Sequence, residues 1–117
     1  MSQQLPAGVV VTKLQTHPDH RGSLTEIFRA GWMGQDTSPA QWNFTVSEAG
    51  VLRGVHLHLI HADYLVVAEG HADIGLRDVR RGSPTEGMAT LVEMKGEQPS
   101  ALTIPPGLIH GLHFHER

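Results

Sequence analysis

The sequence has no cysteine, few aromatic residues and no excess of cations. Without thiols the chain can form no disulfide, no thiolate nucleophile and no thiolate metal site. No apolar run approaches the roughly 20 residues of a membrane span. The formal charge is -3, and the only close group of cations is Arg77, Arg80 and Arg81. These shortages argue against nucleic acid and membrane as partners and favour a cytoplasmic protein.

The composition predicts one folded domain. A length of 117 residues is enough for a single core, so residues 1–117 are expected to form one domain. Helical periodicity is not sustained, whereas short β-rich runs recur between Gly, Pro, Asp and Ser. The predicted strands are 9–14, 23–28, 42–47, 52–59, 64–68, 72–76, 89–94, 101–104 and 109–114. Short strands at this spacing predict an all-β jelly roll or small barrel.

Histidine is abundant, with 9 residues among 117. Its neutral ring binds metals and its charge changes near neutral pH, so the chemistry is expected at the histidines. His56 and His58 alternate along one predicted strand and therefore point to one face. Together with Asp63 and His110 they could form a nitrogen and oxygen site for one divalent metal ion. His61, His113 and His115 are expected to be exposed or supporting residues.

The same residues allow a reaction without a metal. A neutral histidine in a pocket can remove a proton next to a carbonyl group. Tyr64, the only tyrosine, could donate a hydrogen bond or a proton to the enolate oxygen. The alternatives are that these imidazoles only bind backbone groups in a polar cavity and that Tyr64 only packs its ring. Composition and spacing leave these possibilities open.

The strand around His56 has one face with histidines and one apolar face that has to be covered. His56 and His58 lie on one face, and Val55, Leu57 and Leu59 lie on the other. If the histidines point into a barrel, the apolar row needs cover from a second sheet or a second subunit. We therefore expect a homodimer.

Four segments carry a resemblance to a known family. They read DHRGSLTEIFR, QWNFTVSEAGVLRGVHLH, GHADIGLRDVRRGSPTEG and IPPGLIHGLHF. The resemblance as a whole extends from about Val10 to Phe114. In order and spacing they resemble the signatures of the dTDP-4-dehydrorhamnose 3,5-epimerases. The resemblance implies a cupin jelly-roll barrel, also called a double-stranded β-helix, that dimerises. It also implies action on nucleotide-linked 4-keto-6-deoxy sugars, without a cofactor, by proton abstraction beside the carbonyl.

The resemblance implies roles for individual residues. His56 corresponds to the catalytic base, and Asp78, in a D-x-R pair with Arg80, corresponds to a carboxylate that orients and supports that base. Arginines suit a diphosphate because their planar guanidinium groups bind it in a bidentate way. The substrate-binding residues implied by the family are Arg21, Glu26, Gln41, Asn43, Arg53 and His110.

The sequence also departs from the family pattern. Tyr64 stands where family members carry a lysine, and the sequence ends at Arg117, whereas the family continues with a segment that supplies a tyrosine acid. The RGVHLH segment resembles the R-G-x-H-x-H motif of dTDP-sugar 3,4-ketoisomerases more closely than the H-x-Q motif of the epimerases. We therefore expect chemistry on one face of the sugar, with His56 as base and His58 or Tyr64 as the second group. A metal-binding small-molecule cupin and a non-catalytic sugar-binding cupin remain the alternatives.

Overall fold

The computed structural model describes residues 3–33 and 39–117. These residues form nine strands and no helix, which confirms the all-β class. None of the described segments is a helix that could span a membrane. The strands are β1 (Val10–Lys13), β2 (Thr16–Asp19), β3 (Gly22–Thr25), β4 (Leu52–Leu57), β5 (Asp63–Val66), β6 (His71–Asp78), β7 (Ala89–Lys95), β8 (Ser100–Ile104) and β9 (Leu108–Phe114).

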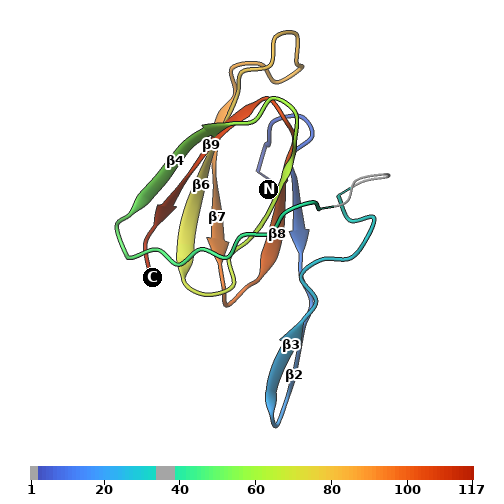
Figure 1. The fold of residues 1–117 in the computed structure, drawn as a ribbon, viewed down its shortest axis with the longest axis vertical. Coiled ribbons are helices and arrows are strands. Elements are labelled where there is room, and N and C mark those ends of the chain that lie inside the picture. Colours follow the sequence, from blue (N-terminus) through green and yellow to red (C-terminus); the bar gives the residue numbers. More distant parts are fainter. Residues whose placement is uncertain (1–2, 34–38) are drawn as a thin grey trace.

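Two antiparallel sheets form the barrel. The strand order is β1-β8-β5 in one sheet and β4-β9-β6-β7 in the other, and β2 and β3 form a separate hairpin. Figure 1 shows the two sheets facing each other, with the hairpin projecting away from the barrel. This arrangement is the jelly roll expected from the sequence.

The core lies between the sheets and follows strand alternation. On β6, Ala72, Ile74 and Leu76 are buried while the residues between them point outwards. They share one apolar cluster with Leu102 and Ile104 of β8 in the opposite sheet. This shared cluster fixes which residues of β6 and its neighbour β9 face the interior.

The N-terminal half differs from the predicted pattern. Residues 42–47, predicted as a strand, form no strand with the described residues, and Trp42 and Phe44 are exposed at 76% and 88%. β3 covers the first part of the predicted strand 23–28, whereas residues 26–28 lie in no strand, and β2 was not predicted. Pro18 lowers the strand signal of β2, yet an edge position in a hairpin tolerates it.

A bulge in β4 turns Arg53 and His56 to the same side. Arg53 pairs with Leu112 and His56 pairs with His110, and the register shifts between them. Such a bulge adds a residue to one strand and reverses its alternation beyond that point. Gly54 lies at the bulge, where an added Cβ would be 2.9 Å from the Cα of Gly111. Only glycine therefore fits there.

Candidate active site

The candidate site lies where β4, β5 and β9 meet at one end of the barrel. His110 is delivered by β9 after a tight turn at Gly107, whose N–H donates to the carbonyl of His58 at 2.8 Å. Gly107 has a φ of 91°, and an added Cβ would be 2.5 Å from Arg80. The sequence Pro-Pro-Gly therefore sets both the turn and the start of β9, and thereby places His110 in the interior at 4% exposure.

One carboxylate joins two of the histidines. Oδ2 of Asp63 lies 3.0 Å from Nε2 of His110 and 3.3 Å from Nε2 of His58. Asp63 starts β5, so this contact links the two sheets. Both contacts are short enough for the carboxylate to attract either ring electrostatically when that ring is protonated.

His110 is held in its neutral form. Burial lowers the pKa of the His110 imidazole below its ordinary value of 6.5, and it outweighs the opposing charge of Asp63. Nδ1 of His110 is buried and has no hydrogen-bond partner among the described residues.

His56 completes the group of imidazoles on the open side. Its ring centroid lies 5.7 Å from that of His110 and 6.1 Å from that of His58. The residue is exposed, and no hydrogen bond ties its ring to another described side chain. An imidazole in this position can meet a ligand while its neighbours are held by Asp63. The predicted set His56, His58 and His110 is thus brought together.

Arg53 faces the same interior side as His56. Its Nε donates to Oγ of the buried Ser47 at 2.6 Å. Because one N–H group is used in this way, the guanidinium has a fixed direction and keeps further donors for an anion. The role of Arg53 in binding a diphosphate stays a prediction.

Asp78 does not support His56, contrary to the expectation. Among the described residues its two carboxylate oxygens accept hydrogen bonds from Arg80, Ser83 and Thr85. The Arg80 guanidinium holds the pKa of this buried carboxyl far below its ordinary value of 3.8, helped by both hydroxyls and opposed by burial. Arg80 in turn donates to the carbonyl of Ala7. Asp78 is therefore a structural centre for the loop after β6.

Tyr64 also has a different position from the one expected. Its hydroxyl donates to the carbonyl of Ile27 at 2.7 Å, and its ring meets that of Phe28 edge-on at 5.1 Å. Burial raises the pKa of the Tyr64 hydroxyl. Asp63, the preceding residue, points to His110, so alternation along β5 turns Tyr64 to the other face. Tyr64 fastens the segment after β3 and is not part of the imidazole group.

The remaining predicted substrate-binding residues lie outside this group within one chain. Arg21 occupies the tip of the projecting hairpin and pairs with Asp19 at 2.7 Å (Figure 1). Glu26 pairs with Arg29 at 2.7 Å. The side chains of Gln41 and Asn43 are exposed and lie 3.5 Å apart. One chain therefore does not bring Arg21 and Arg53 to a common rim.

The group of possible metal ligands differs from the predicted one. The atoms of His58, His61 and Asp63 lie within 4.8 Å of one another, whereas the prediction named His56 and His110 and gave His61 no such part. The rings of His58 and His61 are 4.1 Å apart. His58 and His61 are three positions apart in the segment H-L-I-H, and this spacing is the signal that could have indicated His61. Two imidazoles and a carboxylate are donors that a divalent ion such as Zn²⁺ accepts.

The fold and the group of imidazoles beside Asp63 define a jelly-roll protein of the cupin type with a histidine–carboxylate site. A sequence profile described as dTDP-4-dehydrorhamnose 3,5-epimerase matches residues 4–117. The chain belongs to this family.

Three proteins illustrate the likeness. The chain is 32% identical over 104 residues to the probable low-salt glycan biosynthesis epimerase Agl13 of Haloferax volcanii, covering 88% of this chain and 67% of that protein. It is 39% identical over 99 residues to a dTDP-4-dehydro-6-deoxyglucose 3-epimerase of a Streptomyces species, covering 79% and 50%. ChmJ, a 3'-monoepimerase from Streptomyces bikiniensis crystallised with dTDP-quinovose, superposes with a TM-score of 0.89 at 33% identity, covering 99% and 62%. The chain thus spans between half and about two thirds of these proteins.

Proposed function

We propose that this chain is an isomerase of the epimerase type that acts on a nucleotide-linked 4-keto-6-deoxy sugar by removing a proton beside the carbonyl. The observation that carries the proposal is the exposed His56 beside the buried, neutral His110, with Arg53 on the same interior side. The relatives support the substrate class, because the Streptomyces protein is a dTDP-4-dehydro-6-deoxyglucose 3-epimerase.

His56 is the base in this proposal. Its neutral imidazole takes the proton as the carbon–hydrogen bond breaks, and the electron pair moves to the carbonyl oxygen to give an enolate. The imidazolium that forms and the Arg53 guanidinium both compensate the new negative charge. His58 stays as the second proton-transfer group, because Tyr64 faces elsewhere. Return of a proton to carbon completes the turnover, and no cofactor takes part.

Arg21 requires a second copy of the chain in this proposal. It lies in the turn between β2 and β3, and the hairpin of these two strands projects away from the barrel that carries Arg53 (Figure 1). Large apolar side chains are exposed next to the site, and Val55, Leu59 and Ile60 reach 69%, 79% and 89%. Contiguous apolar surface of this kind marks an interface. A homodimer would cover it and bring the Arg21 of one copy to the other.

Deuterium exchange tests the function. The chain is incubated in deuterated water with dTDP-4-keto-6-deoxyglucose, and the sugar protons are followed by NMR. We expect exchange at one carbon next to the carbonyl, abolished in His56→Asn. The matched control is His71→Asn, at the far end of the outer sheet face, which should exchange at the wild-type rate. Binding of dTDP without exchange would replace the proposal by a sugar-binding function, and exchange at both carbons would refute the restriction to one face.

Sedimentation tests the assembly. We expect a dimer at micromolar concentration and a shift towards monomer in Val55→Asp, because a charge at an exposed apolar position opposes its burial. A wild-type monomer would refute this part of the proposal. The cytoplasmic location stays a prediction.

A metal-dependent pocket is the second candidate, favoured by the cluster of His58, His61 and Asp63. In that case exchange would stop after chelation and return with Zn²⁺, and His61→Ala would lose activity. In the leading proposal exchange persists after chelation, because His56 alone takes the proton.

A further inference from the structure

A second cluster of histidines and carboxylates lies outside the group of His56, His58, His110 and Asp63. Ligand atoms of His71, Asp73 and His115 lie within 4.8 Å of one another. Nε2 of His115 is 2.8 Å from Oδ2 of Asp73, and Nε2 of His71 is 3.1 Å from Oε2 of Glu93. The rings of His71 and His115 are 4.4 Å apart. Imidazoles and carboxylates thus converge at one point of the surface.

Strand alternation places this cluster on the outer face of the sheet. His71 and Asp73 are separated by the buried Ala72 on β6, so both point outwards. Glu93 of β7 is the direct partner of Asp73 and shares that face. His110 faces inwards and pairs with Leu76, which lies five positions after His71 on β6. This separation corresponds to roughly 16 Å along the strand. The two histidine clusters are therefore separate sites.

The backbone holds the cluster in place. The carbonyl of His71 accepts the N–H groups of His115 and Glu116 at 2.8 and 3.3 Å. The segment after β9 is thereby fastened to the first residue of β6, which brings the two imidazoles together before any ligand arrives. His71 is 22% and Asp73 is 25% exposed, so both are half-buried yet reachable.

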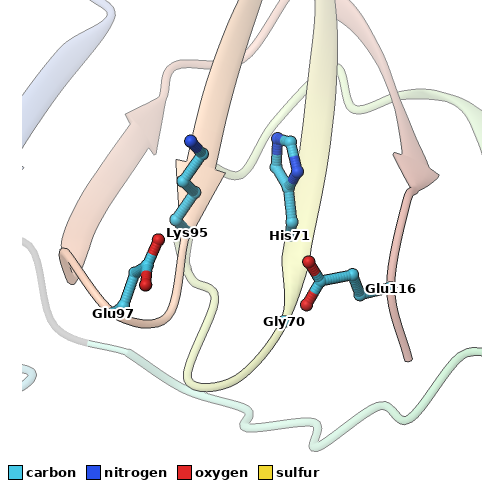
Figure 2. Close-up of a pocket in the computed structure, with 5 residues that line it drawn as sticks. All are labelled: Gly70, His71, Lys95, Glu97 and Glu116. Atoms are coloured by element: carbon cyan, nitrogen blue, oxygen red, sulfur yellow. The ribbon is translucent and has the colours of Figure 1, made fainter.

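The surroundings are rich in carboxylates. Figure 2 shows His71 beside a cavity that Glu116, Glu97 and Lys95 also line. Lys95 is the one cation of that lining, and its Nζ lies 3.6 Å from Glu93. Asp73, Glu93 and Glu116 together exceed this single positive charge. The local charge therefore favours a divalent cation.

We propose that His71, Asp73 and His115 bind a divalent ion of the zinc type. The donors are two nitrogens and a carboxylate oxygen, the set that Zn²⁺ accepts in tetrahedral sites. Bonds of about 2.0–2.1 Å place tetrahedral ligand atoms roughly 3.3 Å apart, so donors within 4.8 Å need only small side-chain rotations. The ion would clamp the end of the chain onto β6 and stabilise the native fold.

Zinc titration of paired variants tests the site. The background is His61→Ala, which removes a ligand of the other cluster, and the second protein adds His71→Ala. Calorimetry with Zn²⁺ should give one equivalent in the first protein and an affinity at least about tenfold weaker in the second. Free Zn²⁺ at about a hundredfold above the dissociation constant should raise the Tm of the first protein by about 10 °C and leave the second unchanged.

Controls separate a lost ligand from a lost fold. His17→Ala, on the projecting hairpin, should bind zinc as the background does, and the circular dichroism of all variants should match. Replacing His115 by alanine should weaken zinc as His71→Ala does. Equal stoichiometry and equal affinity with and without His71 and His115 would overturn the proposal, as would zinc binding that leaves the Tm of the His61→Ala protein unchanged.

Discussion

Replacing Asp78 by asparagine tests the role of the buried carboxylate at the end of β6. Oδ2 of Asp78 accepts hydrogen bonds from Arg80, Ser83 and Thr85 at distances between 2.6 and 2.9 Å. Oδ1 accepts two more from Arg80. Asparagine offers one acceptor oxygen, so its NH₂ group must face donors on one side. The variant therefore leaves donors unpaired and removes the counter-charge of Arg80.

The expected loss in the free energy of unfolding is about 3 kcal/mol. Breaking a buried ion pair by removing one partner costs about 3–5 kcal/mol, and the lower end applies because the Arg80 side chain is 27% exposed. For 117 residues this corresponds to a fall in Tm of roughly 12 °C. His110 should also lose order, because Arg80 packs on Gly107, where the turn into β9 begins.

Urea unfolding at pH 7 and at pH 3 provides the assay. The folded pKa of Asp78 is far below 3.8, so its stabilisation is complete above about pH 4 and decreases as the pH falls further. The wild type and Asp78→Asn should therefore converge in acid. Asp19→Asn, at an exposed pair, is the matched control and should leave the unfolding midpoint unchanged. A loss below about 1 kcal/mol at pH 7, or a gap that does not narrow in acid, would refute the reasoning.

Four further results are expected. Gly107→Ala should lower the unfolding free energy by about 2 kcal/mol in a denaturant titration, because φ is 91° and Arg80 occupies the added Cβ position. Tyr64→Phe should lower it by about 1 kcal/mol and keep the exchange rate, and a large loss of exchange would restore Tyr64 to the chemistry. Arg53→Ala should weaken dTDP binding by about 1.5–3 kcal/mol in calorimetry, and unchanged affinity would contradict the phosphate-side role. Because burial lowers the pKa of His110 below 6.5, its contribution to stability is present above that pH and decreases as the pH falls, and His110→Asn should remove this dependence from the unfolding curves.

The sequence predicted the parts of the fold that alternation and turn residues determine. The buried strand β6 and the Pro-Pro-Gly turn that delivers His110 belong to this group, because their signals are local. The group of His56, His58 and His110 was also predictable, since alternation along β4 and a short turn suffice to aim the rings.

Other features depend on tertiary contacts that no local pattern contains. Asp78 was taken for a support of His56, yet the loop of Arg80, Ser83 and Thr85 folds back and uses both of its oxygens. Tyr64 is predicted to contact the sugar. In the structure the side chain of Asp63, the preceding residue, points to His110, so the side chain of Tyr64 lies on the other face of β5. A family motif gives the residue type at a position, whereas the partner of a side chain depends on the register of strands far apart in the sequence.

Because of the bulge in β4, Arg53 and His56 face the same side only with the present number of residues between them. Deleting one residue there would restore regular alternation, and the guanidinium would then leave the interior while the histidines kept their direction. The two glycines that meet across the strands, Gly54 and Gly111, have to stay small for the same reason, because a side chain at Gly54 would separate β4 from β9. Arg53 and His56, the residues proposed for anion binding and proton transfer, thus depend on one register, and a change of a single residue in length would separate them.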